Sequence, residues 1–261
     1  AYFNNDGLLD LFVTNRVVSN RLYKNNGDDT FEDVTEQVIG LDSMLSYGAS
    51  FADFDNDGFL DLYVANVGEN VLYKNLNGKK FVDVTIKYGA ELSGYCTGTA
   101  TGDIDNDGDV DLYSANYTNG SSVLFVNTID DKNFITIDIK GTISNRDAIG
   151  TKVWLYSAGH AEDKNYLLGF REINGGNSYG SRSSTLVHFG VNANRAYDIV
   201  IFFPASGIKK VLTDIKAGSQ IKVFEEEGFS RTITYFKKTI LRFIENQENQ
   251  IEFLKFFIVV L

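Results

Sequence analysis

Cysteine and histidine are scarce in this chain. Its 261 residues hold one cysteine, Cys96, and two histidines, His160 and His188. A single cysteine cannot form an intrachain disulfide, and these three residues cannot supply the ligands of a structural zinc site. The sequence therefore excludes a disulfide scaffold and a zinc site, and we interpret Cys96 as a small buried residue.

Basic residues and long apolar runs are also in short supply. The chain has 24 Lys and Arg against 35 Asp and Glu, a net charge of −11, which argues against a nucleic-acid partner. The final apolar run, residues 256–261, is far shorter than the roughly 20 residues that a membrane-spanning helix needs. We therefore predict no membrane span. The apolar spacing in the tail, residues 227–261, is compatible with a helix.

One segment of the sequence occurs three times. The copies start at Tyr2, Asp53 and Asp103, each contains Asn-Asp-Gly followed by Asp three residues later, and their central glycines are 51 and 50 residues apart. Two pieces downstream, Leu-Tyr-Lys-Asn and Phe-x-Asp-Val-Thr, recur in the first two copies. A constant period of this length indicates a repeat architecture.

Each unit has the pattern of short strands, because apolar and polar residues alternate between turns of Asn, Gly and Asp. The strands expected in the second unit are residues 47–54, 60–66, 71–75 and 80–84. Four strands in about fifty residues match one β-propeller blade, which must stack on its neighbours to bury its faces. We therefore predict an all-β fold with a partial propeller of about two and a half blades over residues 1–130, and expect the chain to be part of a longer one.

The aspartates of the second and third copies have the spacing of a cation site. Carboxylates stand at positions 1, 3, 5 and 9 of a tight loop, with glycine at position 6. Oxygen ligands in this number suit Ca²⁺, with the carbonyl of position 7 as a further ligand. Position 12 is Val64 or Ser114 rather than the Glu of an EF-hand, so we expect the loops to join strands. The alternative is that these residues only form β-turns.

The first copy lacks two of these carboxylates. Tyr2 and Asn4 replace the aspartates of positions 1 and 3. We expect this loop to be a weak calcium site or none, with Asn4, Asp6 and Asp10 as its remaining ligands.

These segments resemble FG-GAP/VCBS repeats, the calcium-loop blades that also occur in integrin alpha-subunit propellers. Position by position, the resemblance implies side-chain ligands in both complete loops and backbone oxygens of Phe59 and Asp109. The implied side-chain ligands are Asp53, Asp55, Asp57, Asp61, Asp103, Asp105, Asp107 and Asp111.

After Asn127 the repeat stops and a different pattern of strands begins. Strands are expected at residues 133–140, 152–156, 184–189, 197–203 and 219–224, which predicts a small β-sandwich or barrel-like domain over residues 131–226. Four motifs follow in order at residues 145–153, 171–181, 188–190 and 203–207. Together they resemble the ASPIC/UnbV domain, which follows such repeats in proteins similar to cartilage acidic protein and in bacterial secreted relatives. Phe203 departs from that family's usual tryptophan.

We interpret the chain as a non-enzymatic, calcium-stabilised recognition or adhesion module with a protein or glycan ligand. Because millimolar calcium is found outside cells, we expect an extracellular, cell-surface or periplasmic location, with the signal peptide missing from this fragment. An enzyme or accessory unit acting on a polysaccharide or small molecule through a propeller channel is the alternative. Ser181, Ser206, His188 and Asp198 could form a nucleophile, base and orienting group for it, although a packed histidine is commoner in an apolar run such as 186–189. A purely architectural spacer is a third interpretation.

Overall fold

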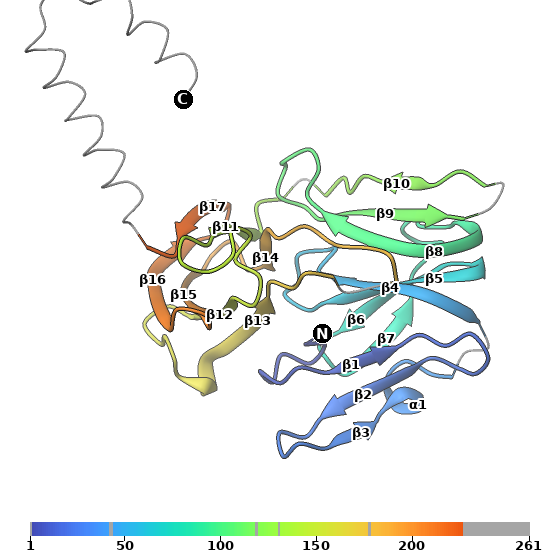
Figure 1. Cartoon of the computed structure of the whole chain (residues 1–261), viewed down its shortest axis with the longest axis horizontal. Helices are drawn as coiled ribbons and strands as arrows, with labels where there is room; N and C mark the ends of the chain where they lie inside the picture. The colour runs from blue at the N-terminus through green and yellow to red at the C-terminus, as the bar shows by residue number, and fades with distance from the viewer. Residues whose placement is uncertain (1, 42–43, 118–119, 130, 177–178, 227–261) are drawn as a thin grey trace, which may run out of the picture.

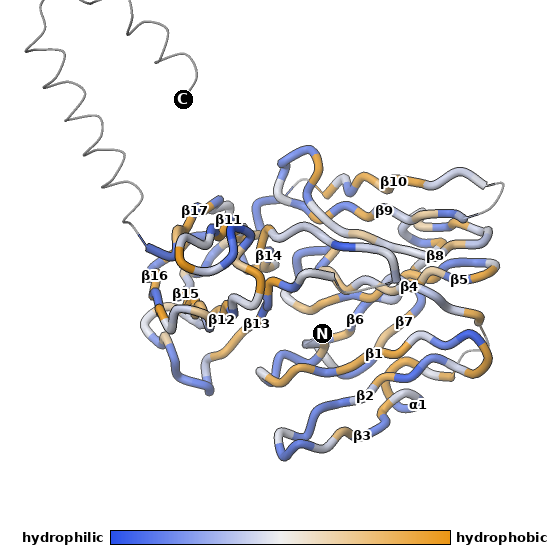
Figure 2. Tube along the Cα trace, in the orientation of Figure 1, coloured by the Kyte–Doolittle hydropathy of each residue, from blue (hydrophilic) through white to orange (hydrophobic). Residues whose placement is uncertain are grey.

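The computed structural model describes residues 2–41, 44–117, 120–129, 131–176 and 179–226. The predicted helix in the tail therefore lies outside the described residues. The described part is almost entirely β-structure, in two groups of sheets that pack against each other (Figure 1). Hydrophobic and hydrophilic residues are interspersed along both groups of strands (Figure 2). The predicted all-β class is confirmed.

The repeats form three blade-like sheets. The first blade contains β1 (Leu11–Val13), β2 (Arg21–Asn25) and β3 (Phe31–Asp33), and the short helix α1 (Thr35–Val38) follows it. The second blade contains β4 (Leu45–Ala52), β5 (Asp61–Glu69), β6 (Val71–Leu76) and β7 (Lys80–Asp83). The third blade contains β8 (Ser93–Gly102), β9 (Asp111–Asn116) and β10 (Val123–Phe125). Neighbouring strands within each blade are antiparallel. The ends of β5 and β8 also pair, which joins the second and third blades into one sheet.

The blades are stabilised by stacking, as the repeat pattern predicts. Strand β5 is buried on both faces: Leu62 and Val64 pack toward the first blade with Phe81, while Tyr63 packs toward the third blade with Leu112. Burial on both faces explains its continuous apolar run.

The outer face of the first blade has no such cover among the described residues. Leu11 and Phe31 occupy the positions of Leu62 and Phe81 in the repeat, yet each is 49% exposed where its counterpart is at most 2% exposed. At the other end of the stack, Tyr113 is 44% exposed, whereas its counterpart Tyr63 is fully buried.

The C-terminal half is a sandwich of two small sheets. One has the order β14 (Val187–Gly190), β11 (Phe134–Lys140), β17 (Ser219–Phe224), and the other has the order β13 (Leu167–Glu172), β12 (Lys152–Ser157), β15 (Ala196–Phe203), β16 (Ile208–Lys216). A short 3₁₀ turn, η1 (Lys164–Tyr166), precedes β13. Ile135 and Ile137 of β11 are fully buried in one core with Ile199 and Ile201 of β15. The predicted sandwich-like fold is confirmed.

Two strands, β13 and β16, and helix α1 are absent from the sequence-based prediction. Strand β16 contains Lys209, Lys210 and Lys216, and it lies at the edge of its sheet, where lysine is typical. Its register shifts opposite Tyr197–Ile199, and Asp214 nearby has a positive φ of 56°. A bulged edge strand lacks clean alternation, so its pattern is weak.

Candidate metal centre

The three aspartate loops share one backbone frame. Loop 1 is residues 2–10, loop 2 is residues 53–61 and loop 3 is residues 103–111, and each leads directly into a strand. Position 4 is an asparagine with φ between 56° and 62°, and position 6 is a glycine with φ between 83° and 104°. Asparagine and glycine are the residues that tolerate this left-handed conformation. The Asn-Asp-Gly motif is therefore explained by the shape of the loop.

The aspartate at position 9 fastens each loop to its blade. In loop 2, Asp61 accepts hydrogen bonds from the backbone N–H groups of Phe54 at 3.2 Å and Asn75 at 2.8 Å. Asp10 and Asp111 accept the corresponding pairs of bonds in loops 1 and 3. This clamp was not foreseen, although the recurring Asp and Asn were visible in the repeat.

An asparagine in β6, Asn75, and its equivalent just after β10, Asn127, also join neighbouring blades. The Asn75 side chain donates to the carbonyl of Phe3 in loop 1 at 2.7 Å, and the Asn127 side chain donates to the carbonyl of Phe54 in loop 2 at 2.7 Å. Loops 1 and 2 are thereby each fixed by the blade that follows, which joins neighbouring blades at their acidic loops.

Loop 2 brings together three of its four predicted side-chain ligands, and Asp57 is not among the three. Oxygen atoms of Asp53, Asp55 and Asp61 all lie within 4.8 Å of one another. Asp53 is 1% exposed, and Asp55 Oδ1 is buried without a hydrogen-bond partner among the described residues. Asp57 is more exposed, and its Oδ1 accepts the N–H of Phe59 at 2.9 Å.

Lys74 of strand β6 contacts two aspartates of loop 2. The sequence analysis did not predict this contact. The Lys74 ammonium lies 2.7 Å from Asp57 Oδ2 and also contacts Asp55 Oδ2. Burial disfavours the charge, but the hydrogen bonds to these two aspartates outweigh it and raise the pKa of Lys74. The recurring Leu-Tyr-Lys-Asn motif was the available signal for this residue.

Loop 3 brings together the equivalent three of its four predicted side-chain ligands, without Asp107. Oxygen atoms of Asp103, Asp105 and Asp111 lie within 4.8 Å of one another, and Asp103 Oδ1 is buried with no hydrogen-bond partner in the described ranges. Asp107 accepts the N–H of Asp109 at 3.0 Å. The side chain of Asp109 is buried and accepts a bond from Asn56 of loop 2 at 2.7 Å, so this residue also links the two loops.

Loop 1 is closed by an amide instead of a third carboxylate. Asn4 Nδ2 donates to Asp6 Oδ2 at 2.8 Å, and Asp6 Oδ1 accepts the N–H of Leu8 at 2.9 Å. Tyr2, in place of the leading aspartate, is buried and packs on Phe170 with ring centroids 4.0 Å apart. Position 1 therefore has a packing role here.

Several of these carboxyls carry raised pKa values. Burial raises the pKa of Asp53 to about 7 and that of Asp61 to about 8, with Asp55 among the neighbouring charges that contribute in each case. Burial likewise raises the pKa of Asp10 and of Asp109 to about 6. Carboxylates this close to one another are stabilised by a cation.

The donor set of loops 2 and 3 fits calcium. It consists only of oxygen atoms, and each loop holds a buried carboxylate oxygen that lacks a hydrogen-bond partner in the described residues. Calcium accepts such oxygen ligands in flexible geometry. Asp53, Asp55, Asp57 and Asp61 would hold the ion in loop 2, and Asp103, Asp105, Asp107 and Asp111 would hold it in loop 3. The carbonyls of Phe59 and Asp109 stay predicted ligands.

Comparisons with known proteins agree with this architecture. The model of the FG-GAP-like repeat matches residues 3–64 and 53–114, and the model named ASPIC and UnbV matches residues 141–229. The chain contains FG-GAP-like repeats followed by an ASPIC/UnbV domain. No curated protein matches the chain. Among the described residues, no helix is long and apolar enough to cross a membrane.

The ASPIC/UnbV domain touches the acidic loops directly through β14. The N–H of Gly190 donates to Asp53 Oδ2 of loop 2 at 3.0 Å, and His188 Nε2 is 3.1 Å from the carbonyl of Gly108 in loop 3. Burial and the nearby Arg171 charge lower the pKa of His188 to about 4, despite its bond to that carbonyl. His188 is therefore neutral at pH 7 and donates this bond. It is a packed, hydrogen-bonded histidine, as its apolar run suggested.

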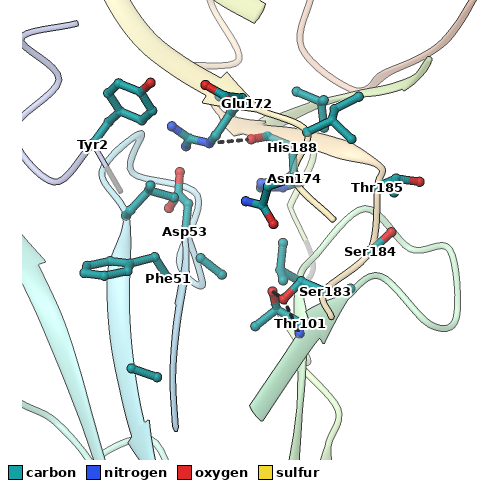
Figure 3. A pocket seen from close by; sticks show the side chains of 18 of the residues that line it. Tyr2, Phe51, Asp53, Thr101, Glu172, Asn174, Ser183, Ser184, Thr185 and His188 are labelled. Carbon is teal, nitrogen blue, oxygen red and sulfur yellow. Dashed lines mark hydrogen bonds between the residues drawn. The ribbon is translucent and has the colours of Figure 1, made fainter. Parts of the chain in front are cut away.

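A segment before β14 also follows the inner strand β8 of the third blade. Ser181 Oγ donates to the carbonyl of Thr99 at 2.6 Å, and the N–H of Ser184 donates to the carbonyl of Thr101 at 2.8 Å. Between this segment and the blades lies a cavity of about 430 Å³. Figure 3 shows that side chains of both halves surround it, including Thr101 and Ser183.

The residues considered for a catalytic triad have other partners. His188 bonds to Gly108, and Ser181 bonds to Thr99. Asp198 is buried and accepts the N–H groups of Gly159 at 2.8 Å and Asp214 at 3.1 Å, which holds the bulge of β16. Ser206 accepts the N–H of Ile208 at 3.3 Å in a turn. These bonds give each residue a structural role.

Proposed function

We propose that this chain is a calcium-stabilised, non-catalytic recognition module that acts outside the cell or on its surface. The observation that carries the proposal is the convergence of carboxylates in loops 2 and 3 at equivalent positions, each loop with a buried oxygen that lacks a hydrogen-bond partner among the described residues. Oxygen-only sites of extracellular modules typically bind calcium at about 10⁻⁴ to 10⁻³ M. Such sites fill only where free calcium is high.

Calcium at these loops would stabilise the stack of blades. Loop 2 is fixed to its own blade and to the third blade, so an ion that holds loop 2 also holds a blade interface. Loop 3 is fixed to its own blade and bonds to loop 2 through Asp109. Free calcium ten to a hundred times above Kd adds roughly 1.4 to 2.7 kcal/mol per site to the stability of the folded state. A protein or glycan is the proposed ligand of the module.

A calcium titration tests this proposal. We expect saturable binding by calorimetry, and a rise in melting temperature, for the full chain but not for a variant with Asp57→Ala and Asp107→Ala. Magnesium at the same concentration is the matched control and should have a smaller effect, since Mg²⁺ demands stricter geometry. Absence of binding and of any shift at millimolar calcium would leave the aspartates as turn residues.

An enzyme is the second candidate, and the cavity between the halves is the observation that favours it. Asp53, Thr101, Ser183 and His188 line this space of about 430 Å³. Activity on a polysaccharide or small molecule that persists in the double aspartate variant and disappears with His188→Gln would support it. If no substrate is turned over by the intact chain, the non-catalytic interpretation stands.

A further inference from the structure

We propose that Lys74 is a tethered cation that competes with calcium for loop 2, so that loop 3 is the stronger calcium site. The inference rests on the proposed calcium binding and names the residue that sets the relative affinities of the two loops.

The Lys74 ammonium occupies the place where a calcium ion would bind two of the loop 2 carboxylates. It pairs with Asp55 and Asp57, which are the carboxylates of positions 3 and 5. The Lys74 side chain is only 20% exposed and those of the aspartates are 23% and 32% exposed, so solvent screens the attraction less than at an open surface. A calcium ion that uses the same oxygens must first displace the ammonium.

The repeat provides the comparison with loop 3. Asn75 and Asn127 occupy the same position, because their backbone N–H groups bond at 2.8 Å to Asp61 and Asp111, respectively. The residue before each asparagine is Lys74 in one unit and Val126 in the other. Within the described ranges, no ion pair joins a lysine or arginine to the carboxylates of loop 3.

The three loops therefore differ in what donates a hydrogen bond to the carboxylate of position 5. In loop 1 the amide of Asn4 donates to Asp6, and in loop 2 the ammonium of Lys74 donates to Asp57. In loop 3 Asp107 accepts only a backbone N–H among the hydrogen bonds of the described residues. Loop 3 also carries one more carboxylate, Asp109. Calcium relieves more repulsion in loop 3, so binding there is stronger.

The first test isolates loop 2 in the full chain. In an Asp107→Ala background, calcium is titrated by calorimetry into Lys74→Met, which keeps the length of the side chain and removes its charge, and into Lys74→Arg, which keeps the charge. We expect Lys74→Met to bind calcium about tenfold more tightly than its background, and Lys74→Arg to bind as its background does. A measurable site that Lys74→Met creates where the background shows none also supports the proposal.

The reciprocal test isolates loop 3 with Asp57→Ala. Val126→Lys should weaken calcium binding about tenfold, while Val126→Met, its uncharged control, should leave the affinity unchanged. Lys74→Met in this background should not alter loop 3. Because Val126 is 48% exposed, these variants are expected to fold, which keeps the test valid if Lys74→Met does not fold.

The outcomes separate this inference from the proposed function. If the unmodified chain binds calcium, but Lys74→Met in the Asp107→Ala background binds no more tightly than that background, the competition by Lys74 is overturned. Equal calcium affinity of Val126→Lys and Val126→Met overturns it as well. If neither the unmodified chain nor any variant binds calcium at millimolar concentration, the proposed function itself fails, and this inference fails with it.

Discussion

Individual aspartates of the loops have different tasks, although they belong to one motif. Asp61 accepts hydrogen bonds from two backbone N–H groups of its blade and is 4% exposed, whereas the side chain of Asp57 is 32% exposed. The spacing of the motif alone predicts both as ligands, because one-dimensional spacing does not report which side-chain oxygens already have partners. Lys74 was missed for the same reason, since its contact with loop 2 spans 17 residues of sequence.

The clamp predicts that Asp61→Ala destabilises the fold even without calcium. Loss of the carboxylate leaves the N–H groups of Phe54 and Asn75 unpaired, which costs about 2–4 kcal/mol. Urea unfolding in excess chelator measures this cost. Asp57→Ala is the control and should cost less than about 1 kcal/mol. Equal losses for the two variants would contradict the clamp.

Glu225 predicts a dependence of stability on pH. Its Oε2 accepts the N–H groups of Thr142, Ile143 and Ser144 at 2.7–2.8 Å. Burial opposes the charge, but the Ser206 side chain and these N–H groups outweigh burial and lower the pKa of Glu225 to about 2. Since the pKa in the folded chain is below that of the unfolded chain, the stabilisation is complete above about pH 4.5 and is lost as pH falls toward 2.

Glu225→Gln tests this linkage. We expect the variant to unfold more easily by on the order of 1–3 kcal/mol at pH 6, with the difference from the parent shrinking as pH falls from 4.5 to 2. Denaturant titrations of both chains across this range provide the measurement. A difference that stays constant down to pH 2 would show that the carboxylate charge is not involved.

Strands of the repeat were predictable at the level of elements, because strict alternation and a fixed period reinforce each other. The predicted strands 71–75 and 80–84 agree closely with β6 and β7. The contact of β14 with loops 2 and 3 was not predictable, since it joins residues 137 positions apart and depends on the docking of two sheets. The edge strand β16 was missed because its bulge and lysines disrupt alternation.

The same contact predicts that Gly190→Ala separates β14 from loop 2. A Cβ atom at this position would lie 2.1 Å from Asp53 Oδ2 and 2.5 Å from the backbone of Asn56, so the backbone must move. We expect a melting temperature several degrees lower, and faster proteolysis between the two halves. Gly176→Ala is the control, because its nearest neighbour would be 3.6 Å away. Equal melting of the two variants would contradict this packing.

At the scale of the whole molecule, the stack of blades has two unlike and complementary ends. The face with Leu11 and Phe31 corresponds to the face that the second blade presents to the first, and the face with Tyr113 corresponds to the one that it presents to the third. The last blade of one chain therefore presents to the first blade of another the same kind of surface that joins blades within the chain. Head-to-tail contacts of this kind give a ring if the rotation between chains closes and an open filament if it does not.

These two exposed faces lead to a prediction for the isolated chain. We expect reversible head-to-tail association that increases with protein concentration, measured by sedimentation velocity. Leu11→Lys should suppress it, whereas Val17→Lys, at a side chain that is already 89% exposed, should not. A chain that stays monomeric at high concentration would contradict the expectation. An exposed blade face is thus a connector, and whichever surface covers it determines whether these repeats form a short stack, a closed ring or a filament.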